Sequence, residues 1–281
     1  PALSPPPIKH SHHFYQLAQH SPLLAAERAR HRRARLGAWA KEPWRRTSGG
    51  RRVSGFADIA ALAAYDAGAL LGRASHRRYL GLFSRARARG QTVGEITPAY
   101  ALLAPEDIDQ VRAKVGPAKI LYVIRAPMAR MWSHLTKGGP RELGAPVSAL
   151  EDEARRRFLL RPHCLERTAY AATLGRWQEA FGPENVLLLF FDDIVTAPEA
   201  FASQLAAFLE LTPGGWDFPG PLNSYQKPGD APSEALQATL AGIALREIAA
   251  LRALGVASTQ HERREEAAQS AQAGRPEPNS G

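Results

Sequence analysis

Cysteine and methionine are scarce in this chain, and long apolar runs are missing. The 281 residues include one cysteine, Cys164, and two methionines. A single cysteine excludes an internal disulfide and any metal site built mainly from cysteines. No apolar run approaches the roughly 20 residues that a membrane-spanning helix needs. We therefore expect no membrane span and a cytoplasmic location, with an upstream targeting segment left open.

Acidic residues are also in deficit. Asp and Glu together number 27 against 36 Lys and Arg, which leaves a net charge of +9. Such a balance favours anionic partners, among them nucleotides, nucleic acids and acidic glycans. Residues 27–52 are rich in arginine but contain no recognisable nucleic-acid reading motif, so we expect no nucleic-acid partner. A basic nucleic-acid-binding protein stays open as a lesser alternative.

Two further motifs are missing. The chain has no G-x-x-x-x-G-K-[ST] loop, which disfavours a nucleotide kinase. Histidines gather near the N-terminus, but no matching group of Cys, Asp or Glu lies beside them. We therefore predict no metal site. The N-terminal histidines are His10, His12, His13 and His20.

The most informative stretch present is GPAKILYVIRAPMARMWSHLTK, residues 116–137. Residues 120–124 are a short apolar run, which predicts a strand buried on both faces. Arg125 follows that strand, and Pro127 suits the first position of a helix. Arg130 and Ser133 are spaced i, i+3 and so share a helix face. Two cations, a hydroxyl and a helix N-terminus together predict a phosphate-binding site.

Strands and helices alternate along the chain, which predicts an α/β fold with a mostly parallel sheet. We expect one domain over residues 1–256 and a disordered tail over 257–281, where the sequence is polar and rich in Ala, Pro and Gly. A Gly/Pro-rich break is expected at 138–146. The other helices are expected at 57–72, 76–89, 105–115, 146–159, 164–181, 199–209 and 233–254, and the other strands at 92–95 and 185–191.

Several motifs resemble, in order, those of the sulfotransferase domain family, in particular the bacterial and heparan-sulfate-type carbohydrate sulfotransferases. Residues 94–100 read GEITPAY, and Arg125, Pro127, Arg130 and Ser133 match every fixed position of the family's R-x-P-x-x-R-x-x-S motif. Further matches are Cys164-Leu165, Tyr170-Ala171, Arg176-Trp177, FGPENVLLLFFDDI, FLEL and NSYQKP. The resemblance covers roughly residues 90–255.

The resemblance implies a P-loop-like three-layer α/β/α fold that uses 3′-phosphoadenosine 5′-phosphosulfate (PAPS) as co-substrate. The acceptor would be a hydroxyl or amine of a carbohydrate or other small molecule. By resemblance, Arg125 and Ser133 hold the donor's 3′-phosphate, and Lys227 lies in a loop that closes over the nucleotide. Glu42 resembles the family's acidic residue that accepts a proton from the acceptor. For Lys227 and Glu42, a solvated loop position is the alternative.

The N-terminus departs from the family pattern. The family has a strand followed by K-x-G-T-T, which holds the 5′-phosphosulfate. Here Lys9 aligns with the lysine, Ser11 with the glycine, and His12 and His13 with the two threonines. Prolines stand where the first strand would be, so we expect that strand to be altered or missing. Without glycine the backbone approaches a phosphate less freely.

Two functional classes within this family stay open, beside the lesser alternative of nucleic-acid binding. The first is a PAPS-dependent sulfotransferase with Lys9 and Glu42 as catalytic residues. The second is a catalytically impaired relative that binds a nucleotide or glycan without transferring sulfate. The altered loop at residues 9–13 is the feature that separates the two.

Overall fold

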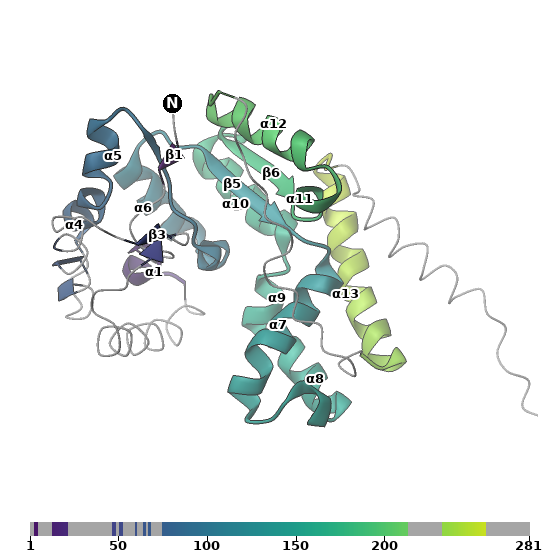
Figure 1. The fold of residues 1–281 in the computed structure, drawn as a ribbon. Helices are drawn as coiled ribbons and strands as arrows, with labels where there is room; N and C mark the ends of the chain where they lie inside the picture. The colour runs from purple at the N-terminus through teal and green to yellow at the C-terminus, as the bar shows by residue number, and fades with distance from the viewer. Residues whose placement is uncertain are drawn as a thin grey trace, which may run out of the picture. The chain divides into compact units, whose positions relative to one another are not determined.

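The computed structural model describes the central part of the chain and short pieces nearer the N-terminus (Figure 1). Its contacts divide the chain into two compact units. Unit 1 contains residues 1–120, 176–185 and 202–215, and unit 2 contains 121–175, 186–201 and 216–281. The expectation of one domain over 1–256 stays a prediction. The described residues are 3–4, 13–21, 47–48, 51–52, 60, 64–65, 67–68, 75–212 and 232–256.

Unit 1 combines short helices with two pairs of short strands. β1 (Leu3–Ser4) pairs in parallel with β4 (Thr92–Val93), and β2 (Thr47–Ser48) pairs antiparallel with β3 (Arg51–Arg52). Its longest complete helix is α6, which begins at a proline and ends at Gly116 with φ of 69°. The helical elements are α1 (His13–Leu17), α4 (His76–Gly81), α5 (Ser84–Ala88), η1 (Pro98–Leu102), α6 (Pro105–Val115) and η3 (Pro183–Asn185).

Unit 2 is built around a pair of strands and the helices that follow them in the chain. β5 (Ile120–Ile124) pairs with β6 (Val186–Phe190), and the Phe191 N–H donates to the Ile124 carbonyl at 2.7 Å. The helical elements are α7 (Pro127–Leu143), η2 (Val147–Ala149), α8 (Asp152–Leu159), α9 (Pro162–Glu166), α11 (Asp193–Thr196) and α13 (Glu234–Ala253). Two more helices, α10 (Tyr170–Phe181) and α12 (Pro198–Leu209), begin in unit 2 and end in unit 1.

Strand β5 has the predicted bounds but is not buried on both faces. Leu121 and Val123 are 41% and 44% exposed, whereas Ile124 is buried. Ile124 packs with Tyr170 and Leu251, which come from α10 and α13. The prediction of two-sided burial is therefore wrong for the described structure, because these helices cover only one set of alternating side chains.

The expected break at 138–146 is also wrong in part, since α7 runs through Gly138, Gly139 and Pro140 to Leu143. Tertiary packing outweighs the low helix propensity of these residues. A Cβ on Gly138 would lie 3.6 Å from the Phe158 ring, so α8 packs directly against this part of α7. The buried core between α7, α8, α9 and α13 consists of Met131, Leu135, Val147, Phe158, Leu159, Cys164, Leu236 and Leu240.

Several other predicted elements are confirmed. The helices at 105–115, 199–209 and 233–254 and the strand at 185–191 match the structure to within a residue or so. The helix expected at 164–181 is instead two, α9 and α10, and the helix expected at 76–89 is also two, α4 and α5. No helix of the described residues is both long and apolar enough to cross a membrane. The tail at 257–281 lies outside the described residues.

Candidate functional site

Arg125 lies between the end of β5 and the start of α7. Its guanidinium carbon is 5.4 Å from the centroid of the Phe191 ring, a cation–π distance. Its Nε atom is buried and has no hydrogen-bond partner within the described structure. A buried guanidinium N–H without a partner is costly. An anion bound at the end of β5 would supply the missing acceptor.

The first turn of α7 has features that favour such an anion. The residue before the helix is Ala126, which provides no side-chain cap, and the first turn has no acidic residue. The free N–H groups and the helix dipole make the N-terminus of this 17-residue helix electropositive. Ser133 lies further along α7 and is half-buried. A guanidinium, free N–H groups and a hydroxyl are a donor set that fits a phosphate.

Arg130 does not belong to this donor set, although the sequence predicted it as the second cation of the phosphate-binding site. Its Nη1 donates to the Cys164 carbonyl at 2.8 Å and to the Thr168 hydroxyl at 2.9 Å. Burial lowers the pKa of this guanidinium from its ordinary value. Arg130 therefore ties α7 to α9 and to the turn after it.

Tyr170, the first residue of α10, is part of the Tyr170-Ala171 match to the family, but the sequence assigned it no role in the site. The side chain is buried, and its hydroxyl has no hydrogen-bond partner of good geometry within the described structure. Burial raises the pKa of the hydroxyl, while the charge of Arg130 and the backbone N–H of Arg125 oppose the rise. The hydroxyl is thus a second buried polar group, near Arg125, that can take a ligand as its partner. The motif match placed Tyr170 in the family pattern, but a tyrosine at a helix start carries no spacing signal for ligand binding.

Glu247 of α13 holds the start of α10. Its Oε1 accepts a hydrogen bond from the Ala171 N–H at 2.6 Å. A carboxylate at a helix N-terminus is favoured by the free N–H groups and the dipole. Burial raises the pKa of Glu247, and hydrogen bonds from the backbone of Ala171 and Tyr170 oppose this. Glu247 thereby fixes the position of Tyr170.

His13 is the one described residue of the altered N-terminal loop, and it is fully buried. Its ring stacks on Tyr79, with centroids 4.2 Å apart and planes 3° apart. Phe14, Tyr65 and His76 also contact it. Burial, followed by neighbouring charge that includes His76, lowers the pKa of His13 from 6.5 to about 3. His13 is therefore neutral at pH 7 and part of an aromatic core in unit 1.

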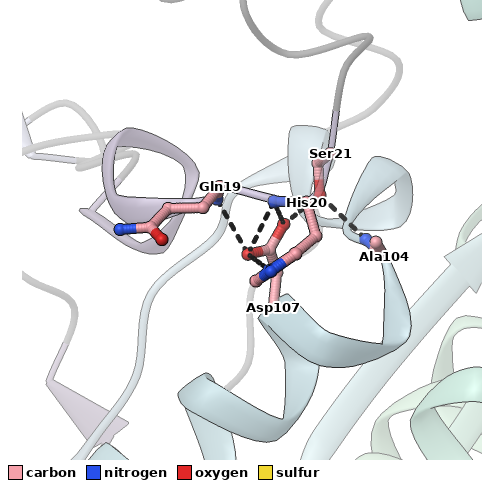
Figure 2. A network of polar contacts seen from close by, with 5 residues as sticks. All are labelled: Gln19, His20, Ser21, Ala104 and Asp107. Carbon is pink, nitrogen blue, oxygen red and sulfur yellow. Dashed lines mark hydrogen bonds and ion pairs between the residues drawn. The ribbon is translucent and has the colours of Figure 1, made fainter.

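Residues 19–21 are held by one buried carboxylate, that of Asp107 in the first turn of α6 (Figure 2). It accepts hydrogen bonds from the Gln19 N–H at 2.9 Å, the His20 N–H at 3.1 Å and the Ser21 hydroxyl. The Ser21 hydroxyl oxygen accepts from the Ala104 N–H at 2.8 Å. Burial alone would raise the pKa of Asp107, but these hydrogen bonds lower it below its usual value. The network anchors the segment that follows α1.

The other predicted site residues lie outside the described residues, and their roles stay predictions. They are Lys9, Ser11, His12, Glu42 and Lys227. Of the predicted set, the structure describes Arg125 and Ser133 on one strand–helix unit, and His13 in the core of unit 1.

Comparisons with known proteins point to one family. A model of the sulfotransferase family matches residues 5–217. A search of curated proteins finds no match. The solved sulfotransferase from Alicyclobacillus acidocaldarius is 21% identical over 94% of this chain and 89% of that one, with a TM-score of 0.54. The sulfotransferase domain from the curacin biosynthetic pathway is 16% identical over 76% of this chain and 74% of that one, with a TM-score of 0.42.

The likeness to the Alicyclobacillus structure confirms the predicted three-layer α/β fold. The family model spans well over half of the 281 residues. Its range includes β5, Arg125 and all of α7. The chain belongs to the sulfotransferase family.

Proposed function

We propose that this chain transfers a sulfuryl group from PAPS to a hydroxyl or amine of a carbohydrate or another small metabolite. The observation that carries the proposal is Arg125, whose buried Nε has no partner in the described structure and lies where β5 meets α7. A dianionic phosphate satisfies that N–H and the open first turn of the helix together. The donor supplies the sulfuryl group; binding and orienting it are tasks of the protein.

In this proposal the residues divide into two groups. Arg125, Ser133 and the start of α7 bind the 3′-phosphate, and the buried Tyr170 hydroxyl donates a further hydrogen bond nearby. Lys9, with Ser11 and His12, holds the 5′ end, whereas His13 is buried in the aromatic core of unit 1 and takes no part. Lys227 closes over the nucleotide. Sulfuryl transfer depends mainly on positioning and on stabilising developing charge. The positive charge of Lys9 provides that stabilisation.

Glu42 accepts the proton of the acceptor hydroxyl or amine. A carboxylate does this effectively when its pKa is raised or when it is held within hydrogen-bond reach of the acceptor. Replacing Glu42 with Gln removes the base and retains a hydrogen-bonding side chain. We expect this variant to bind nucleotide normally and to turn over more slowly.

A second candidate function is nucleotide binding without transfer. The burial of His13 favours it, because a ring stacked on Tyr79 in an aromatic core is not free to hold a phosphosulfate. The two candidates share the 3′-phosphate site and differ only at the reactive end. One set of measurements therefore separates them.

The experiment uses radiolabelled PAPS and the full chain. Release of labelled sulfate to water, or to any acceptor in a panel of sugars, amines and phenols, reports transfer even when the natural acceptor is not identified. Sulfotransfer predicts label release that depends on Glu42 and Lys9. Tight binding of 3′,5′-ADP with no release establishes the second candidate, and absence of nucleotide binding contradicts both.

A further inference from the structure

Three potential metal ligands meet where α7 packs against α9. His134 lies on α7, and His163 and Cys164 lie on α9. One ligand atom of each residue lies within 4.8 Å of the others. The Cys164 Sγ is 3.4 Å from the His163 Nε2, and the two imidazole centroids are 5.6 Å apart.

The surrounding core holds these side chains in place. Cys164 is fully buried in the core between α7, α8, α9 and α13. The Phe158 ring contacts both imidazoles, at centroid distances of 5.6 Å to His134 and 6.4 Å to His163. Arg130 fixes the Cys164 backbone through its carbonyl. The ligand atoms are therefore brought together by packing and do not depend on a flexible loop.

Two imidazoles and one thiol match the ligands that Zn²⁺ prefers. Two nitrogens and one sulfur around a tetrahedral zinc lie about 3.3–3.6 Å apart, given Zn–N of about 2.0–2.1 Å and Zn–S of about 2.3 Å. The Sγ–Nε2 distance of 3.4 Å already meets this requirement. The ligand atoms all lie within 4.8 Å of one another, so the wider pairs must close up when an ion binds.

The chemistry of the ligand atoms narrows the choice of ion. Four charged side chains act on the thiol: Glu142, Arg130, Arg161 and Arg167. Glu142 pairs with Arg161 at 3.1 Å. A metal that binds Cys164 must displace the thiol proton, because the ligand is the thiolate. Hard cations such as Mg²⁺ or Ca²⁺ gain little from such ligands. An ion that forms a strong bond to a thiolate is required.

We propose that His134, His163 and Cys164 form a Zn²⁺ site that fastens α9 to α7, with water in the fourth position. The site is independent of the proposed transfer reaction, because none of its ligands belongs to the donor-binding set. One ligand, His134, follows Ser133 directly in α7. A bound ion would therefore also stiffen the helix whose first turn binds the anion.

Cobalt substitution tests the proposal directly. The chain has only one cysteine, so any charge-transfer absorption between a thiolate and Co²⁺ must come from Cys164. We expect the wild-type chain to develop this band with one equivalent of Co²⁺ and to lose it when Zn²⁺ is added. The variants Cys164→Ser, His134→Gln and His163→Gln should abolish or strongly weaken it. Zn²⁺ should also raise the melting temperature of the wild type more than that of Cys164→Ser.

His76→Gln is the matched control, since His76 lies on α4 in unit 1, away from the cluster in sequence. It should leave the thiolate band unchanged. Circular dichroism checks that each variant is folded, and the wild-type titration decides the question even if a variant is not. The proposal is overturned if Co²⁺ binds the wild type without a thiolate band, as binding by the N-terminal histidines would, or if both histidine variants keep the band.

Discussion

Arg130 on α7 donates a hydrogen bond to the Cys164 carbonyl on α9 at 2.8 Å, and this bond joins the two helices. Arg125, only five residues earlier, instead has a buried Nε without a partner in the described structure. Two arginines of one motif thus have different roles. Arg130 stabilises the fold of unit 2, whereas Arg125 is available to a ligand.

Replacing Arg130 with Met should therefore destabilise the protein. The variant loses hydrogen bonds to the Cys164 carbonyl and the Thr168 hydroxyl but keeps an apolar stem. We expect the free energy of unfolding, measured by urea denaturation at pH 7, to fall by about 1.5–3 kcal/mol. Arg156→Met is the control, because Arg156 is half exposed and pairs with Glu153 only at 3.7 Å. The control should change stability by less than about 0.5 kcal/mol. Equal losses in the two variants would contradict the assigned role.

Acid should weaken the fold through His13. Its pKa is about 3 in the folded chain and 6.5 ordinarily, so the unfolded chain takes up a proton that the folded chain does not. The stability contributed by neutral His13 is full above pH 6.5 and is lost progressively as pH falls toward 3. The variant His13→Phe keeps an aromatic ring and cannot titrate.

The measurement for His13 is the free energy of unfolding from about pH 8 to about pH 4 in both proteins. The wild type should lose more stability than His13→Phe over this range, by up to about 1.4 kcal/mol per pH unit. Parallel curves would show that His13 titrates normally. An NMR titration in which the His13 ring shows a midpoint near 6.5 would likewise contradict the lowered pKa.

Asp107 should act in a lower pH window. Its pKa is lowered in the folded state, so its contribution is present above about pH 4 and is lost as pH falls further. Asp107→Asn removes the charge that accepts hydrogen bonds from Gln19, His20 and Ser21. We expect a loss of about 1–3 kcal/mol at pH 7. The difference from wild type should shrink at about pH 3. Asp109→Asn, an exposed neighbour on α6, should have little effect at either pH.

Local sequence was sufficient to predict β5, α6 and the position of Arg125. The apolar run at Ile120–Ile124, the proline at the start of α6 and the glycine after it act within a few residues. The same local rules failed at residues 138–140, where packing against α8 keeps α7 helical. They also failed to separate α9 from α10.

The contacts that complete the site are not local, which explains why sequence patterns missed them. Arg130 finds its acceptors 34 and 38 residues away, and Ala171 finds Glu247 76 residues away. His13 matches a threonine of the family motif only by alignment, and its burial depends on aromatic residues far along the chain. Tyr170 belongs to a motif match, but only its buried hydroxyl without a hydrogen-bond partner makes it a candidate for the site.

The central claim is that Arg125 binds the 3′-phosphate of the donor nucleotide. Calorimetry with 3′,5′-ADP and with 5′-AMP tests it most directly, because the two ligands differ by that phosphate alone. Arg141→Ala is the control, since it removes an exposed charge from the last turn of the same helix. Arg125→Ala should weaken 3′,5′-ADP binding by about 1.5–3 kcal/mol, roughly 10- to 150-fold in Kd. Binding of 5′-AMP and the stability of the protein should hardly change. Equal losses for both nucleotides, or unchanged 3′,5′-ADP binding, would contradict the claim.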